Sequence, residues 1–167
     1  MTDPVGGRPF MPGYGVLPAD QGSGVMPWSE AEQRLTASHD YWCATVRPDG
    51  RPHAMPVWGV WLAGRVWFSS SLGSRKARNL AADPRCTITT DDALNPVVVD
   101  GVAERVTDAD RIAAFVDAVN AKYDADMTVD FLDPAVNGTY AVRPVTVIAM
   151  THDDFTGSPT RWMFPPA

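Results

Sequence analysis

The segment Pro52–Leu62 restricts the fold more than any other part of the chain, because it predicts a long strand that is apolar on both faces. Successive side chains of a strand point to opposite sides of the sheet. The apolar residues here fall on both sides: Met55, Val57 and Trp61 on one face, and Pro56, Trp58, Val60 and Leu62 on the other. A strand with one solvated face would alternate apolar with polar residues. We therefore expect a barrel interior against one face and a helix, a ligand or a second subunit against the other.

Pro56 adds a restriction of its own, since proline has no N–H group to donate to a neighbouring strand. We therefore expect a bulge or a sheet edge at Pro56. Either irregularity would leave main-chain groups open to a flat ligand.

The segments around this strand predict a small antiparallel barrel. Pro48-Asp49-Gly50 and Ala63-Gly64 are turn sequences, so the strands that they join form a meander with tight connections. The predicted order along the chain is a helix, three strands, a helix, two strands, a helix and a strand. The predicted helices cover 30–38, 74–82 and 107–123, and the first opens with the capping box Ser29-Glu30-Ala31-Glu32. The predicted strands are Tyr41–Arg47, Pro52–Leu62, Arg65–Ser70, Arg85–Thr90, Val97–Val106 and Gly138–Met150. Antiparallel strands with a few separated helices indicate a mainly β fold, namely a closed or partly split barrel.

The chain divides into an arm and one domain. Residues 1–27 contain six Gly and five Pro without a hydrophobic period, a composition that favours an extended arm. Residues 28–167 are enough for a single ligand-binding domain. Of the whole chain, 45% is hydrophobic, which supports a sizeable core.

The helix over 74–82 opens with Ser74-Arg75-Lys76, directly after a strand and a glycine turn. A helix N-terminus carries free N–H groups and a positive dipole end, so it binds anions. Ser74 can cap this helix, whereas Arg75 and Lys76 place two positive charges where they oppose the dipole. A bound anion would compensate for that repulsion. We therefore predict a phosphate-binding site at Ser74, Arg75 and Lys76.

Charge and hydropathy exclude two classes of partner. The net charge is −6, although residues 34–90 carry +5 and residues 91–134 carry −8. This acidity argues against non-specific nucleic-acid binding. Because no apolar run is long enough for a bilayer and no basic start precedes an apolar stretch, we expect no membrane partner and a cytoplasmic location. Cys43 and Cys86 lie within predicted strands without the spacing of a metal or redox site, so we expect two buried thiols.

Three segments resemble the pyridoxamine 5′-phosphate oxidase-like superfamily, and more narrowly its flavin/deazaflavin oxidoreductases of the B type. They are TVRPDGRPHAMPVW at 45–58, VWFSSSLGSRKARNLAADPRC at 66–86 and VVVDGVAERV at 97–106, and the likeness extends over about residues 28–164. The resemblance implies a six- to seven-stranded antiparallel split β-barrel of the FMN-binding type. It also implies a homodimer with the cofactor at the subunit interface.

The same resemblance implies which residues bind the cofactor. They are Ser74, Arg75, Lys76 and Asn79 at the phosphate, Ser69 and Ser70 along the ribityl and phosphate region, Met55, Pro56, Val57 and Trp58 beside the ring, and Arg161 and Trp162 from the partner subunit. Arg78 and Arg85 would either remain surface charges or receive an acidic cofactor tail. Trp61 and Trp67 are expected to pack in the core or at the dimer interface.

Three departures from the pyridoxamine phosphate oxidases shift the expected cofactor. Those enzymes carry an Arg and a Lys in the second strand and a Gln on the fifth, whereas this chain has Met55, Val60 and Pro96 near those positions. Vitamin B6 oxidation is therefore not expected, and the deazaflavin coenzyme F420 is preferred over FMN.

We therefore expect an oxidoreductase that transfers a hydride from reduced coenzyme F420 to an unsaturated or oxidised small molecule. The cofactor would carry the chemistry, so no side chain is assigned as a catalytic acid or base. The alternatives are an FMN-binding protein of the same fold and a flavin or haem carrier without turnover. His39, His53 and His152 lack metal-ligand spacing, so we expect structural roles and no metal site, with a haem-ligating His left open under the carrier alternative.

Overall fold

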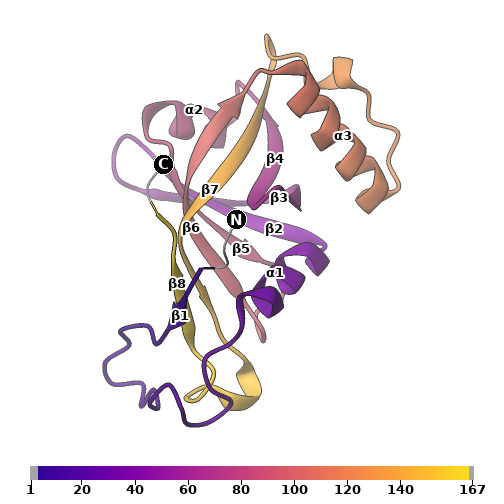
Figure 1. Ribbon diagram of the computed structural model, residues 1–167. Helices are drawn as coiled ribbons and strands as arrows, with labels where there is room; N and C mark the ends of the chain where they lie inside the picture. The colour runs from indigo at the N-terminus through magenta and orange to yellow at the C-terminus, as the bar shows by residue number, and fades with distance from the viewer. Residues whose placement is uncertain (1–3, 166–167) are drawn as a thin grey trace.

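The computed structural model describes residues 4–165 and confirms a mainly β fold (Figure 1). The strands are β1 (Gly6–Gly7), β2 (Asp40–Val46), β3 (Pro52–Leu62), β4 (Arg65–Ser71), β5 (Arg85–Thr90), β6 (Val97–Val106), β7 (Asn137–Ala149) and β8 (Thr160–Met163). The helices are α1 (Trp28–Ala37), α2 (Arg75–Ala82) and α3 (Ala109–Tyr123), with short 3-10 helices η1 (Val129–Leu132) and η2 (His152–Asp154). Within the described residues, no helix is long and apolar enough to cross a membrane.

Six of the strands form a closed antiparallel barrel. Their order is β7-β4-β3-β2-β5-β6, and β6 pairs back onto β7 to complete the ring, while β8 and then β1 continue from β7. The β6–β7 register shifts between Asp100 and Gly101, which marks a bulge. Gly101 is required there because a Cβ atom would lie 2.6 Å from the carbonyl oxygen of Arg143. The split-barrel prediction is therefore confirmed.

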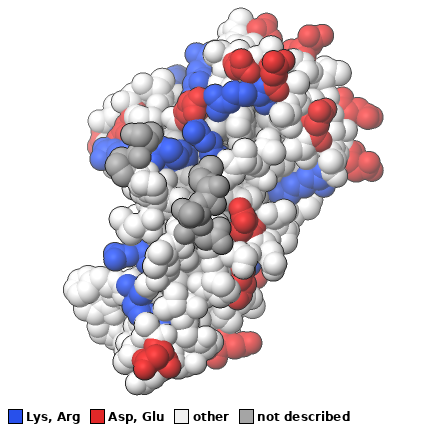
Figure 2. Space-filling view, in the orientation of Figure 1, with Lys and Arg blue, Asp and Glu red and all other residues white. Residues whose placement is uncertain are grey.

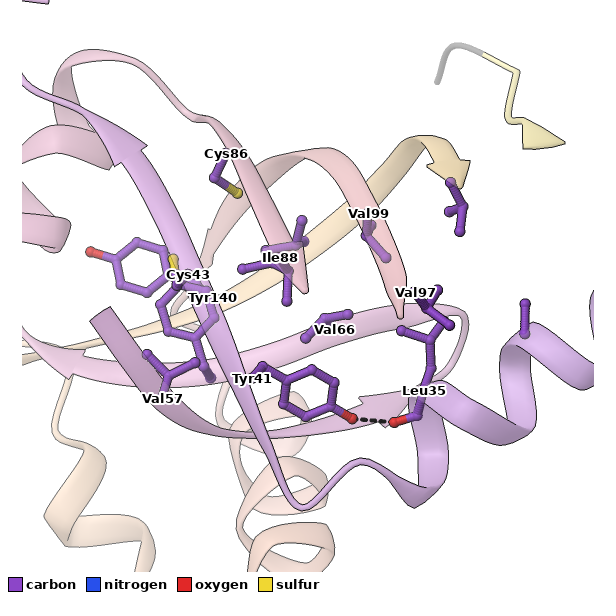
Figure 3. Close-up of a cluster of buried hydrophobic side chains, with 14 of the residues drawn as sticks. Leu35, Tyr41, Cys43, Val57, Val66, Cys86, Ile88, Val97, Val99 and Tyr140 are labelled. Carbon is purple, nitrogen blue, oxygen red and sulfur yellow. Dashed lines mark hydrogen bonds between the residues drawn. The ribbon is translucent and has the colours of Figure 1, made fainter. Parts of the chain in front are cut away.

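Apolar side chains from the inner faces of the strands fill the barrel (Figure 3). Tyr41 is fully buried among them, and its hydroxyl donates to the carbonyl oxygen of Leu35 in α1. Cys43 and Cys86 are free and buried, as expected. Burial raises the pKa of the Cys43 thiol to about 12, so it remains protonated at neutral pH.

The strand β3 has the two-sided cover that its sequence predicts, but only along half of its length. On the inner face, Val57 and Trp61 pack into the barrel core. On the outer face, Val60 and Leu62 pack beneath α3. On the same outer face but nearer the start of β3, Trp58 remains 53% exposed. One half of the outer face is therefore left bare in the single chain.

The strand β3 also has a free edge, as Pro56 predicts. It pairs with β2 along Pro52–Trp58, but with β4 only along Gly59–Leu62. Over Pro52–Trp58, the side of β3 that faces away from β2 has no strand partner within the described residues. No register shift occurs at Pro56, so the irregularity is an edge and not a bulge.

The last turn of α3 secures β3 at the point where it leaves β4. The N–H of Gly59 donates to the Tyr123 hydroxyl at 2.8 Å, and the Lys122 ammonium donates to the Gly59 carbonyl at 2.7 Å. Lys122 also lies over the Tyr41 ring, with its nitrogen 4.6 Å from the ring centroid. Burial lowers the pKa of Lys122 to about 8, although the charges of Asp40 and Asp91 oppose this shift.

The predicted capping box of the first helix is wrong. The helix α1 begins at Trp28, after Pro27, so Ser29 lies inside its first turn and no side chain caps it. Trp28 is buried and makes edge-to-face contacts with Trp61, Trp162 and Phe164. This aromatic packing determines where the helix begins, and it outweighs the smaller gain from a cap.

The arm is held against the barrel by its own chain. Gly6 and Gly7 pair with Trp162 and Arg161 in β8. The Arg8 guanidinium donates to the carbonyl oxygens of Pro159 at 2.9 Å and of Pro18 and Gln21 at 3.0 Å. These contacts order residues that lack a hydrophobic period, so composition alone did not reveal them.

Replacing Gly59 with Ala should destabilise the protein, because a Cβ atom there would lie 2.8 Å from the Trp67 carbonyl and 3.0 Å from the Tyr41 ring. We expect a loss of about 1–3 kcal/mol in the free energy of unfolding, measured by urea denaturation. Gly7→Ala is the control, since nothing lies within 4 Å of its added Cβ. Equal stability of the two variants would contradict this description of Gly59.

Candidate functional site

The N-terminus of α2 brings three predicted phosphate ligands together. Ser74 caps the helix, and its Oγ accepts a hydrogen bond from the N–H of Ala77 at 3.1 Å, as predicted. The Ser70 hydroxyl, from the end of β4, donates to Ser74 Oγ at 2.9 Å. The Lys76 ammonium lies 3.4 Å from Ser70 Oγ, and Arg75 is exposed beside it. Two hydroxyls, one ammonium and one guanidinium therefore meet at a helix N-terminus.

These cations are not neutralised by carboxylates. Elsewhere on the surface, Arg51 pairs with Asp49 and Arg85 with Asp83, each at 2.6 Å. Hydrogen bonds from Arg85 hold the pKa of Asp83 at about 2, so Arg85 already has a carboxylate partner. In contrast, Arg75 and Lys76 form no ion pair within residues 4–165. The site therefore fits an anion.

The β2–β3 hairpin adds two basic residues that sequence reasoning did not assign to the site. Thr45 lies opposite His53 in the hairpin, and the buried Asn79 of α2 donates from Nδ2 to Thr45 Oγ1 at 2.9 Å. Burial lowers the pKa of His53, and so do the charges of Arg47, Lys76 and Arg75. Both Arg47 and His53 stand in the TVRPDGRPH segment, but only the hairpin register places them beside α2.

Two of the residues predicted near the phosphate, Asn79 and Ser69, do not face the cluster at the N-terminus of α2. Asn79 is fully buried, so it supports the junction of α2 with β2 from beneath. Ser69 pairs with Thr139 and, because side chains alternate along a strand, faces the side of β4 opposite to Ser70. Ser70 therefore lies in the cluster and Ser69 does not.

The segment predicted to run beside the ring lies on the free edge of β3. Met55 and Pro56 are exposed there, whereas Val57 is buried. Trp58 stacks on Tyr123, with ring centroids 4.5 Å apart and an interplanar angle of 6°. A free strand edge presents unpaired main-chain donors and acceptors, so it can bind the polar rim of a flat ligand.

The outer face of β2 and β3 is apolar and exposed. We call it the Trp42–Trp58 face, and it consists of Trp42, Val46, Pro52, Pro56 and Trp58. Trp42 and Val46 are 49% and 48% exposed. A groove of about 620 Å³ opens beside it, lined in part by Thr45, Val46 and Pro52. The groove is large enough for part of a cofactor-sized molecule.

The C-terminal strand does not bring Trp162 to the site. Its side chain is fully buried in its own chain, and its ring centroid lies 5.4 Å from that of Trp28. Arg161, next to it, is partly exposed. Trp61 and Trp67 also have local partners, since their indole N–H groups donate to Glu32 and to the Leu62 carbonyl at 3.0 Å each.

Acidic and basic side chains are spread unevenly over the surface. Figure 2 shows acidic side chains gathered over the α3 end at the upper right and a few at the lower end, and basic side chains between the centre and the α2 side. Within the described part of the chain, no three His, Cys, Asp or Glu residues are grouped as metal ligands. The arrangement can therefore attract an anion at α2 without a metal.

Comparisons with known proteins agree with the fold. Residues 28–154 match the family model described as pyridoxamine 5′-phosphate oxidase. A solved structure titled F420 reductase is 28% identical with a TM-score of 0.57, over 70% of this chain and 94% of that one. A search of curated protein sequences finds no significant match.

Two further solved structures are similar. One is a heme binding protein from Mycobacterium smegmatis, with 27% identity and a TM-score of 0.55, over 80% of this chain and 62% of that one. The other is a conserved hypothetical protein from Mycobacterium tuberculosis, with 22% identity and a TM-score of 0.66, over 85% of this chain and 91% of that one. The second likeness concerns the fold alone.

Two substitutions at Ser74 separate its role as a cap from the charge of the site. Ser74→Ala removes the acceptor for the Ala77 N–H, so it should lower the free energy of unfolding by about 0.5–2 kcal/mol. Ser74→Asp keeps a cap acceptor and adds a negative charge near Arg75 and Lys76, so it should retain wild-type stability. Thermal and urea unfolding measure both values. Loss of stability in the Asp variant would contradict the excess of positive charge at this site.

Proposed function

Since the chain belongs to the pyridoxamine 5′-phosphate oxidase family, we propose that it is an oxidoreductase with a flavin-like cofactor, preferably the deazaflavin coenzyme F420, and a small-molecule substrate. The observation that carries this proposal is the unpaired cluster of Arg75 and Lys76 at the N-terminus of α2. The free edge of β3 belongs to the hairpin whose end packs against α2. A phosphate site beside an open strand edge suits a cofactor with a phosphate and a flat ring.

The residues at α2 fit a phosphate chemically. Arg75, Lys76, and the hydroxyls of Ser70 and Ser74 are donors, and the helix dipole favours a negative charge at the same place. These residues would hold the phosphate group of either F420 or FMN. Their role is to bind and orient the cofactor.

The ring would lie along the free edge of β3. Main-chain groups around Pro56 and Val57 would bind its polar rim. Met55 and Trp58, which point to opposite faces of β3, would flank the edge along which the ring lies. A bound deazaflavin supplies hydride-transfer chemistry, and no acid or base from the chain is assigned to the reaction. The protein's contribution is orientation and the exclusion of water.

F420 is preferred because the family's additional charged residues are missing. Met55 is exposed and uncharged, and Val60 is buried beneath α3, where it could not contact a cofactor on the free edge. Both positions differ from the charged residues of pyridoxamine phosphate oxidases. The similarity to the F420 reductase structure supports the same choice. FMN is the alternative cofactor.

A homodimer would complete the site. The Trp42–Trp58 face is an exposed apolar surface, which marks an interaction site on a protein of this size. A second copy packed on this face would cover the outer side of β3 and enclose the cofactor between subunits.

A flavin or haem carrier without turnover is the second candidate. The observation in its favour is the 27% identity to the mycobacterial heme binding protein. Such a role needs no substrate and no reduced cofactor.

Titration of the purified protein with F420, FMN and haemin separates these functions. The oxidoreductase proposal predicts quenching of F420 fluorescence, followed by turnover of reduced F420 with an electrophilic substrate such as an enone or a quinone. Haem binding without binding of F420 or FMN would support the carrier and reject the oxidoreductase.

Replacing Arg75 and Lys76 together with Ala should weaken cofactor binding at least 100-fold. Each charge-assisted hydrogen bond contributes about 1.5–3 kcal/mol, and about 1.4 kcal/mol corresponds to a tenfold change in affinity. The control is the double variant Arg65→Ala with Arg111→Ala, which removes the same charge from residues paired with Glu104. Unchanged affinity in the first variant would show that the phosphate binds elsewhere.

Sedimentation should give a mass about twice the 18.1 kDa of the chain. Placing Glu at both Trp42 and Trp58 should convert the protein to monomers, because each indole is about half exposed and would be buried against the second copy. Glu at Val129 and Phe131, which are exposed in η1, is the matched control and should leave the dimer intact. A wild-type protein that sediments as a monomer at micromolar concentration would exclude the homodimer.

A further inference from the structure

The junction between the β2–β3 hairpin and α2 contains a group of polar atoms without partners. Six enclosed side-chain nitrogen or oxygen atoms lack a hydrogen-bond partner in the described part of the chain, and three of them are Arg47 Nε, His53 Nδ1 and Asn79 Oδ1. Asn79 and His53 both adjoin Thr45, since Asn79 bonds to Thr45 and Thr45 lies opposite His53. Arg47 follows two residues after Thr45, and its charge acts on the His53 ring. Enclosed polar atoms normally have partners, so a concentration of exceptions marks a place where water, an ion or a ligand can bind.

The charges around His53 are of one sign. The ionisable groups that act on its ring are Arg47 from the hairpin and Arg75 and Lys76 from α2, and all three are positive. Asp49 and Arg51, at the tip of the same hairpin, form an ion pair at 2.6 Å and so neutralise each other. No carboxylate within residues 4–165 is paired with Arg47, Arg75 or Lys76. Such a group of cations in a chain of net charge −6 requires a specific cause.

We propose that Arg47 and His53 complete the anion site at the N-terminus of α2, and that His53 takes up a proton when an anionic group binds there. The inference rests on the proposed function, since it concerns the same phosphate site. Arg47 would add a guanidinium donor on the hairpin side of the phosphate. His53 would add a second positive charge, but only once the anion is present to stabilise it.

The charges around His53 determine how anion binding and the protonation of its ring affect each other. Without an anion, burial and three cations lower the pKa of His53, so its ring is neutral near pH 7. A bound anion favours the charged imidazolium and raises that pKa. Between the two pKa values, binding takes up one proton, and the affinity for the anion therefore rises as the pH falls. A rise of about one pKa unit gives at most about a tenfold difference in affinity, reached between a pH well below the lower pKa and a pH well above the higher one.

The test is an NMR titration of the His ring signals with and without sodium sulfate. Sulfate is the probe because it remains doubly charged from about pH 5 to 9, whereas a phosphate monoester itself titrates near pH 6. The chain has three histidines, so the variants His53→Gln and His39→Gln assign the signals. His39 is the matched control, since it is exposed and lies beside Asp40, away from the cluster.

We expect saturating sulfate to raise the pKa of His53 and to leave the ring signals of His39 and His152 in place. The sulfate affinity of the wild type should rise several-fold from pH 8 to pH 5.5, with about tenfold as the limit for a rise of one pKa unit. In His53→Gln this pH dependence should disappear, whereas His39→Gln should keep it. A His53 pKa that sulfate does not move, or an unchanged pH dependence in His53→Gln, would overturn the proposal.

Titrations of the same samples with F420 and FMN distinguish this inference from the proposed function. Cofactor binding together with an unresponsive His53 would reject the role of His53 and retain the oxidoreductase. A sulfate-dependent His53 pKa without binding of either cofactor would retain the anion site and reject the oxidoreductase.

Discussion

The pairing of β6 with β7 closes the sheet into a barrel, and the position of every candidate binding residue depends on that closure. It runs from Val97 opposite Ala149 to Val106 opposite Thr139, with a single bulge at Asp100 and Gly101. Because β7 also pairs with β4, the ring determines where β4 ends, at Ser70 and Ser71. The helix α2 begins directly after that end. The residues that we propose as phosphate donors are therefore placed by the barrel, and not by a flexible loop.

A second constraint is that β3 pairs with β4 only from Gly59 onward. Tyr123 and Lys122 bond to the main chain of Gly59 at this point, so α3 fixes the place where the free edge ends. Before Gly59, β3 lies beside β2 alone, and it starts at the hairpin that packs against α2. One strand thus joins an open edge suited to a flat ring with a basic cluster suited to a phosphate. Neither feature depends on a particular catalytic side chain, which agrees with chemistry supplied by a cofactor.

Local patterns in the sequence predicted those parts of the structure that local forces determine. The two-sided apolar character of β3, the edge at Pro56 and the Ser74 cap each follow from a few neighbouring residues. The proposed contribution of Arg47 and His53 could not be predicted in this way, because it depends on the hairpin register and on contact with a helix over twenty residues away. Trp162 illustrates the same limit, since pairing with Gly6 and Val147 turns its ring into the core. At Trp28, aromatic packing outweighed a local capping signal.

The central claim is that the cations at the N-terminus of α2 bind the phosphate of the cofactor. The most direct test is the ratio of two dissociation constants, measured by fluorescence for coenzyme F420 and for its deazaflavin fragment without the phosphate-bearing chain. Loss of two charge-assisted contacts predicts that the fragment binds at least about 100-fold more weakly, at about 1.5–3 kcal/mol for each contact. Equal affinities for the two compounds would contradict the claim and would place the main binding energy at the ring.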